Sequence, residues 1–295
     1  MPDALPDERA LAFPCHGAWL YGILSLPAMS ATAHPRGVLI VVGGPQYRAG
    51  SHRQFTLLAR DLAAAGIPAM RFDYRGMGDS EGDLQNFENV NDDVRAAIDR
   101  FFAEVPGLQE VVLWGLCDGA SAAAMYAPQD TRVTGLVLLN PWVRTEEGAA
   151  RATIKHYYKD RLFDARLWKK IARGQFDAAG SLRSLFQNLG KAIGATAAVD
   201  TAGAGAGTGV DADAPLPERM QAALSRFGGR VLVVLSGADL TAQEFADLTR
   251  RPTWQRLINS PRFTRQQIDK ADHTFSRRPW QDQVSGWTRE WLRMW

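Results

Sequence analysis

Residues 111–126 read VVLWGLCDGASAAAMY, which is an apolar run, a tight turn flanked by glycines, and a run of small residues. The apolar run predicts a buried strand and the small residues predict a helix, so Cys117 falls at the tip of the turn between them. Gly115 and Gly119 flank this tip because strand and helix backbones approach too closely there for side chains. A strand, sharp turn and helix in this order present the tip residue as a candidate nucleophile.

Strands and helices alternate on both sides of this turn. Apolar segments predict strands at 19–27, 38–42, 67–73, 111–114, 133–139, 231–235 and 263–268. Helices are expected at 55–65, 90–104, 117–126, 242–259 and 280–295. This alternation predicts an α/β fold with a mostly parallel, doubly wound sheet and helices on both faces.

The alternation stops in the middle of the chain. Residues 141–229 begin with a charged, helical stretch and contain a loop at about 192–214 that is rich in Ala, Gly, Thr and Asp. We expect a helical cap insertion at 141–229 with a flexible loop. The first part of the core is then 1–140 and the second part is 230–295.

Composition excludes several classes of protein. The net charge of +2 does not indicate a nucleic-acid partner. Two cysteines, Cys15 and Cys117, do not form a disulfide framework, which favours a reducing compartment. The polar, acidic N-terminus does not resemble a signal peptide, and no apolar run is long enough to span a bilayer. We expect a cytoplasmic protein without a membrane span, and its oligomeric state stays open.

Hydrolysis by an attacking side chain needs a nucleophile, a base, an acid that orients the base, and donors for the oxyanion. Cys117 is the candidate nucleophile, since a helix N-terminus favours a thiolate; the alternative is an inert buried cysteine. His273 is the candidate base because it follows the last strand. Asp239, at the carboxyl end of strand 231–235, is the candidate acid. Glu244 is the alternative acid, and either carboxylate could serve only as a helix cap.

The oxyanion donors are expected on two backbone segments. One is the N–H of Asp118, the residue after the candidate nucleophile. The other lies in the loop after strand 38–42, where Pro45 has no N–H to offer. Gln46 is therefore the first choice and Gly44 the second, although the Gly43–Gly44 pair is also compatible with a simple turn.

Basic side chains gather around the same predicted edge of the sheet. They are Arg48, His52 and Arg53 on the loop after strand 38–42, and Arg277 and Arg278 after His273. Ligands bind at the carboxyl edge of open α/β sheets, so this cluster predicts an anionic substrate such as a carboxylate or phosphate ester. A solvated basic surface explains the cluster equally well. No metal ion or other cofactor is expected.

Further motifs give a family resemblance. The stretch FDYRGMGDSEG at 72–82, together with the glycine-flanked turn, the Gly-Gly loop and the late histidine, resembles the α/β-hydrolase fold family. The resemblance covers nearly the whole chain except the expected cap. It implies that Arg75 and Asp79 are structural members of the 72–82 loop.

A narrower resemblance comes from the residues around the candidate site. The stretches GGPQYR at 43–48, GSHRQF at 50–55, GLCDGAS at 115–121 and DLTAQEF at 239–245 resemble the exosortase A system-associated hydrolases. These bacterial proteins are encoded near exopolysaccharide and protein-sorting machinery. The resemblance implies a hydrolase linked to envelope polymer production, although cysteine replaces the usual serine and glycine replaces a histidine often found in the oxyanion loop.

The predicted reaction is hydrolysis of an acyl bond through an acyl-thioenzyme on Cys117. Thiolates favour esters with activated leaving groups, thioesters and lactones over plain amides. The expected partner is a small-molecule or glycan-linked acyl substrate. Two alternatives stay open: acyl transfer by the same residues, and a noncatalytic scaffold that binds an envelope-biosynthesis partner.

Overall fold

The computed structural model describes residues 7–28, 34–44, 46–144 and 214–295. The chain divides into two compact units, one formed by residues 1–143 with 216–295 and the other by residues 144–215. Only the first unit is described below. The expected insertion at 141–229 and its loop at 192–214 lie mainly outside the described residues and stay predictions. Residues 216–229, which fall inside the expected insertion, belong instead to the first unit.

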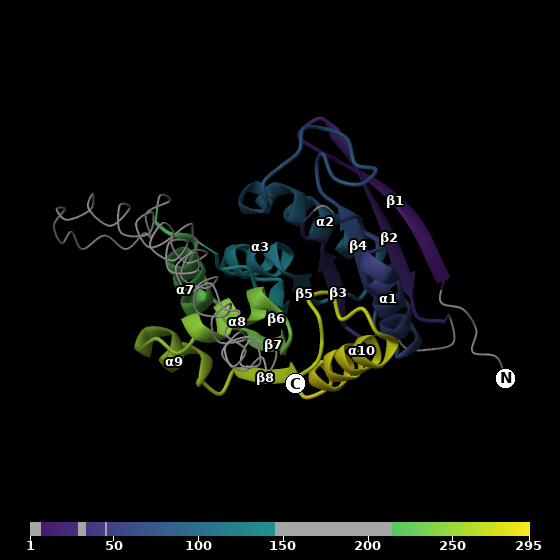
Figure 1. Ribbon diagram of the computed structural model, residues 1–295. Helices are drawn as coiled ribbons and strands as arrows, with labels where there is room; N and C mark the ends of the chain where they lie inside the picture. Colours follow the sequence, from purple (N-terminus) through teal and green to yellow (C-terminus); the bar gives the residue numbers. More distant parts are fainter. Residues whose placement is uncertain (1–6, 29–33, 45, 145–213) are drawn as a thin grey trace, which may run out of the picture. The chain divides into compact units, whose positions relative to one another are not determined.

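A single eight-stranded sheet forms the centre of the first unit (Figure 1). The strand order is β1-β2-β4-β3-β5-β6-β7-β8, with β2 antiparallel to β1 and β4 and the other neighbours parallel. The strands are β1 Asp7–Cys15, β2 Ala18–Leu26, β3 Arg36–Val41, β4 Ala69–Asp73, β5 Glu110–Leu116, β6 Val133–Leu139, β7 Arg230–Ser236 and β8 Phe263–Ile268. The predicted mostly parallel sheet is confirmed.

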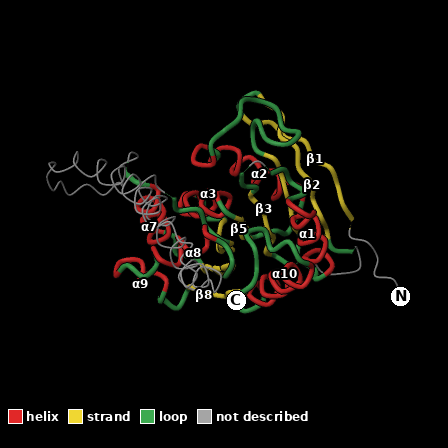
Figure 2. The backbone as a smooth tube through the Cα atoms, viewed as in Figure 1, coloured by secondary structure: helices red, strands yellow, loops and turns green. Residues whose placement is uncertain are grey.

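Helices cover both faces of the sheet, as the flanking red segments in Figure 2 show. Alternate residues of β3 enter two different hydrophobic clusters: Leu39 and Val41 pack on one face, and Val38 and Ile40 on the other. Helices α1 and α10 pack on the face of Val38; α2, α3, α7, α8 and α9 pack on the opposite face. The helices are α1 Gln54–Ala64, α2 Asn91–Glu104, α3 Asp118–Tyr126, α7 Leu216–Arg226, α8 Leu240–Leu248, α9 Pro252–Ile258 and α10 Arg278–Leu292.

Two elements differ from the sequence-based expectation. Strand β1 was not predicted; it pairs with β2 along its whole length, and only its second half alternates between exposed and buried residues. The single helix expected at 242–259 is two helices, α8 and α9. Pro252 begins α9, because proline suits the first turn of a helix but not its interior.

The carboxyl ends of the parallel strands meet at one edge of the sheet. The loop after β3, the turn after β5 and the segments after β6, β7 and β8 all begin there. Cys117, Asp239 and His273 lie in the segments that follow the ends of β5, β7 and β8, so the topology gathers them at one edge.

Candidate active site

Cys117 occupies the sharp turn between β5 and α3. Its backbone has φ 61° and ψ −125°, which is a strained conformation for a residue with a side chain. Neighbouring strands hold this turn in place, because the Cys117 N–H donates to Leu139 O at 2.9 Å and Cys117 O accepts from the N–H of Ala120 at 3.1 Å. The half-buried thiol therefore sits at the N-terminus of α3 on a fixed backbone.

Glycines make this close approach possible. A Cβ on Gly115 would lie 2.4 Å from Gly119 O, and a Cβ on Gly119 would lie 2.5 Å from Val41 O. A Cβ on Gly43 would lie 2.4 Å from Gly119 N. The close approach of strand and helix that Gly115 and Gly119 predicted is thus present, and the structure adds that the Cys117 turn and the loop after β3 are packed backbone against backbone.

Substituting Gly119 is expected to damage both stability and the site. In Gly119→Ala the new methyl group meets the backbone of Val41, which cannot move as a side chain can, so unfolding should become easier by about 1–3 kcal/mol. Gly286→Ala is the matched control, because a Cβ there meets nothing within 4 Å inside α10 and alanine is the better helix former. Denaturant unfolding should show a loss for the first variant and none for the second. Equal stabilities would contradict this packing.

His273 and Asp239 lie together beside this turn. The Nδ1 atom of His273 is 3.0 Å from Asp239 Oδ2, and the side chain of Cys117 lies near enough to raise the pKa of the histidine. The structure therefore brings together the three residues predicted from the chain order.

These contacts change the protonation of the histidine. The hydrogen bond between His273 and the accepting carboxylate of Asp239 raises the pKa of His273 to about 10; the interaction with Cys117 adds to the shift and burial opposes it. The imidazolium form therefore persists well above neutral pH. A positively charged ring therefore lies beside the side chain of Cys117 at neutral pH.

Asp239 has two roles at once. Its Oδ2 accepts from the backbone N–H of Ala242 at 2.9 Å, which caps α8, and the same oxygen faces His273. The capping role that the sequence offered as an alternative thus coexists with the contact to the histidine. Glu244 lies one turn further along α8, so we favour Asp239 as the orienting acid.

Asp272, next to the histidine in sequence, is used elsewhere. Its carboxylate accepts from the backbone N–H of Ser276 at 2.9 Å and from the Ser276 hydroxyl. Burial would raise the pKa of Asp272, but these hydrogen bonds lower it. Asp272 therefore closes the turn that carries His273.

The loop after β3 lies against the N-terminus of α3, where oxyanion donors were expected. Asp118 contributes a carboxylate to this contact, which accepts from the N–H of Gly119 at 3.0 Å and from the N–H of Gly44. Burial raises the pKa of Asp118, and these N–H donors oppose the shift. Gln46 and Gly44 both stay candidate donors on this loop, and the Gln46 side chain accepts from Ser51 N–H at 3.3 Å.

Arg48 is held inside the fold, which favours a structural role over the expected substrate contact. Its backbone N–H donates to Asp73 Oδ1 at 2.6 Å, and its guanidinium pairs with Asp73 and, at 2.5 Å, with Asp79 Oδ2. Asp73 is fully buried, and burial raises its pKa although Arg48 opposes the shift. Arg48 thus ties the loop after β3 to the end of β4.

Removing this guanidinium should be costly. In Arg48→Met the buried carboxylate of Asp73 loses its counter-ion, and we expect unfolding to be easier by about 3–5 kcal/mol at neutral pH. The loss should shrink as the pH falls, because protonating Asp73 removes the buried charge. Arg9→Met is the control, since the Arg9–Asp7 pair is about half exposed. A loss no larger than that of the control in denaturant unfolding would contradict the structural role.

The other basic residues of the expected cluster are exposed. His52 and Arg53 have left-handed backbones with φ 53° and 60° just before α1, and the charge of His52 contributes to the lowered pKa of Asp272. Arg277 precedes α10, and its Cζ lies 4.9 Å from the centre of the Trp280 ring. His52, Arg53 and Arg277 remain candidates for an anionic substrate.

Sequence reasoning missed two polar residues at the site. Asn140 follows β6 and Ser236 ends β7; both are buried and they hydrogen-bond each other. The available signal was a polar residue directly after an apolar strand, which is too common a pattern to single out a site.

Comparisons with known proteins bear on the fold that carries these residues. The family model described as "Serine aminopeptidase, S33" matches residues 33–159, which include β3 to β6 and the Cys117 turn. Among solved structures, the Pyrococcus furiosus esterase Pf2001 superposes with a TM-score of 0.64 at 12% identity, covering 98% of this chain and 93% of the esterase. The chain has the α/β-hydrolase fold.

Other solved hydrolases show the same fold. Est1E from Butyrivibrio proteoclasticus, solved with ferulic acid bound, has a TM-score of 0.60 at 15% identity. The match covers 96% of this chain and 98% of the Est1E chain. XC6422 from Xanthomonas campestris, described as an α/β serine hydrolase without lid, has a TM-score of 0.55 at 18% identity over 100% of both chains. No curated protein matches the chain. Together the family match and these neighbours support an α/β-fold hydrolase.

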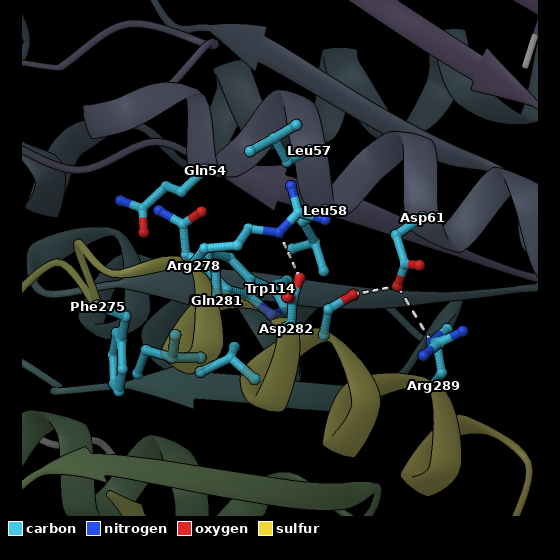
Figure 3. A pocket seen from close by; sticks show the side chains of 13 residues that line it. Gln54, Leu57, Leu58, Asp61, Trp114, Phe275, Arg278, Gln281, Asp282 and Arg289 are labelled. Carbon is cyan, nitrogen blue, oxygen red and sulfur yellow. Dashed lines mark hydrogen bonds and ion pairs between the residues drawn. The ribbon is translucent and has the colours of Figure 1, made fainter. Parts of the chain in front are cut away.

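A cavity of about 260 Å³ lies between α1 and α10 of this hydrolase fold (Figure 3). Trp114 and Phe275 line it, and the side chains of Arg278 and Asp282 pair at 2.7 Å beside it. It is separate from the contact between Cys117 and His273, since neither residue lines it. Within the described residues, no helix is both long and apolar enough to cross a membrane.

Proposed function

We propose that the protein hydrolyses an acyl bond with Cys117 as the nucleophile, His273 as the base and Asp239 as the orienting acid. The observation that carries this proposal is the position of His273, which lies 3.0 Å from Asp239 Oδ2 and near enough to Cys117 for that side chain to raise its pKa. Nucleophile, base and acid in one hydrogen-bonded series are the arrangement that acyl-transfer chemistry requires.

The reaction begins from a thiolate and an imidazolium. The Cys117 thiolate attacks the acyl carbon, and the backbone N–H groups of Asp118 and Gln46 stabilise the oxyanion. The leaving group departs with the proton from His273, leaving the acyl group bound to sulfur. His273, now neutral, removes a proton from water; the resulting hydroxide attacks the thioester, releases the acid and restores the ion pair.

The sulfur nucleophile restricts the substrate class. A thiolate is expelled from a tetrahedral intermediate more easily than an alkoxide, so a poor leaving group such as an amine is at a disadvantage. Esters with activated leaving groups, thioesters and lactones are therefore favoured over amides, although the matched family model is named for an aminopeptidase. The exposed His52, Arg53 and Arg277 favour a substrate with a negative charge.

The narrower assignment rests on the resemblance of 43–55, 115–121 and 239–245 to the exosortase A system-associated hydrolases. On that basis we propose a cytoplasmic enzyme that processes a small or glycan-linked acyl compound in envelope polymer production. Acyl transfer to a sugar or amine uses the same intermediate, with the acceptor in place of water.

A substrate panel tests the proposal. Wild-type protein is assayed with p-nitrophenyl esters, acyl thioesters, lactones and anilides, each with and without added alcohol acceptors. The proposal predicts turnover of the first three classes and little turnover of anilides. Acyl products on the added alcohols would identify a transferase, and the absence of turnover for every class would support the scaffold alternative.

A further inference from the structure

Two residues outside the proposed catalytic set contact the backbone on both sides of the histidine. Asn140 Nδ2 donates to His273 O at 2.9 Å, and Ser236 Oγ donates to Asp272 O at 2.8 Å. These two carbonyl groups belong to the peptide units that immediately precede and follow the Cα of His273. The backbone of the histidine is therefore fixed from both ends.

We propose that Asn140 and Ser236 are positioning residues that set the direction of His273 toward Cys117. This proposal rests on the proposed function, in which His273 is the base and Cys117 is the nucleophile. We refer to the pair as the Asn140–Ser236 bridge.

The bridge uses the hydrogen-bonding capacity of both side chains. Asn140 Nδ2 donates to Ser236 Oγ at 2.8 Å as well as to His273 O, and Asn140 Oδ1 accepts from the Ser236 backbone N–H at 2.8 Å. The Ser236 hydroxyl in turn donates a hydrogen bond to Asp272 O. Asn140 is fully buried and Ser236 is 2% exposed, so water cannot replace these bonds.

The bridge also connects the base to the nucleophile. The N–H of Cys117 donates to the carbonyl of Leu139, the residue next to Asn140. Two successive hydrogen bonds thus run from the backbone of Cys117 through the end of β6 to the carbonyl of His273. A shift of Asn140 would change the separation between the sulfur and the imidazole.

The choice of asparagine fits this task. Asn140 has a left-handed backbone with φ 43°, a conformation that asparagine tolerates better than most residues. Its amide supplies two N–H donors, whereas an aspartate of the same shape supplies none. A purely apolar residue would fill the space without fixing the loop.

The test compares the alkylation of Cys117 by iodoacetamide in folded variants across pH 6 to 10. Asn140→Gly removes the amide but accepts the left-handed backbone, and Ser236→Ala removes only the hydroxyl. His273→Ala gives the rate without a base. Tyr126→Phe is the matched control, because it deletes a buried hydrogen bond to Asp130, of 2.9 Å, that does not contact the His273 turn.

We expect both bridge variants to alkylate on the order of ten times more slowly than wild type at pH 7, with rate–pH profiles that approach that of His273→Ala. Tyr126→Phe should keep the wild-type profile even if it unfolds more easily. If Asn140→Gly does not fold, Ser236→Ala decides alone.

Wild-type profiles in the folded bridge variants would overturn the positioning role while leaving the proposed function intact. If instead wild-type Cys117 reacts no faster than a thiol in the unfolded protein and His273→Ala changes nothing, the proposed function fails, and the positioning role with it.

Discussion

Replacing Cys117 with alanine should reduce kcat/KM for a responsive ester or thioester by at least about a thousandfold. The physical reason is that the acyl-thioenzyme cannot form, and neither His273 nor the oxyanion donors replace a missing nucleophile. The measurement is steady-state hydrolysis, with unfolding curves recorded for the same samples. The free energy of unfolding should change little, because the Cys117 side chain is small and only half-buried.

Two variants control for this result. Cys117→Ser keeps a nucleophilic atom at the turn and tests whether the site needs a thiol; it should retain less activity than wild type, because a hydroxyl has to be deprotonated during the attack. Cys15→Ser removes the other cysteine, which is buried in β1 and whose pKa burial raises, and it should keep full activity. Activity in Cys117→Ala equal to that of wild type would contradict the assignment.

Replacing His273 with alanine should expose the dependence of the thiol on its base. Because the pKa of His273 is raised to about 10, the wild-type imidazolium persists from pH 6 to 9, and alkylation of Cys117 should vary little over that range. An unassisted thiol titrates near pH 8.5, so at pH 7 only about one in thirty is a thiolate. The variant should therefore alkylate about thirtyfold more slowly at pH 7, with rates that rise toward pH 9.

The raised pKa also has a consequence for stability. The folded protein holds a proton on His273 that the unfolded chain releases near pH 6.5, so the contribution to stability is full below pH 6.5 and is lost as the pH rises toward 10. In the Cys117→Ala background, where no thiol exchanges a proton on unfolding, the free energy of unfolding should fall more steeply over this window with His273 present than with His273→Ala. Parallel pH dependences in the two proteins would contradict the ion-pair description.

Most strands and helices could be predicted in order, because buried strands are short apolar runs and helices carry apolar residues every three to four positions. The residues at the strand ends followed from the topology, since parallel strands direct their carboxyl ends to one edge. Cys117, His273 and Asp239 could be named on this basis, and the structure places them in contact. Their chemical roles stay predictions.

Other features depend on contacts between distant parts of the chain. The pairing of Arg48 with Asp73 joins a loop to the end of another strand, and no local pattern marks it. Asn140 and Ser236 are 96 residues apart in the sequence, and they come into contact only because β6 and β7 lie side by side. By contrast, the break between α8 and α9 was visible in the sequence as Pro252.

The central claim is that Cys117 carries the acyl group during turnover. The most direct measurement is intact-protein and peptide mass spectrometry after rapid quenching of wild-type protein with an excess of an activated ester. The account predicts one acyl adduct on the peptide that contains Cys117, removed by hydroxylamine, absent from Cys117→Ala and longer-lived in His273→Ala. Turnover of the ester by wild type with no adduct on Cys117, or with equal rates in Cys117→Ala, would contradict it.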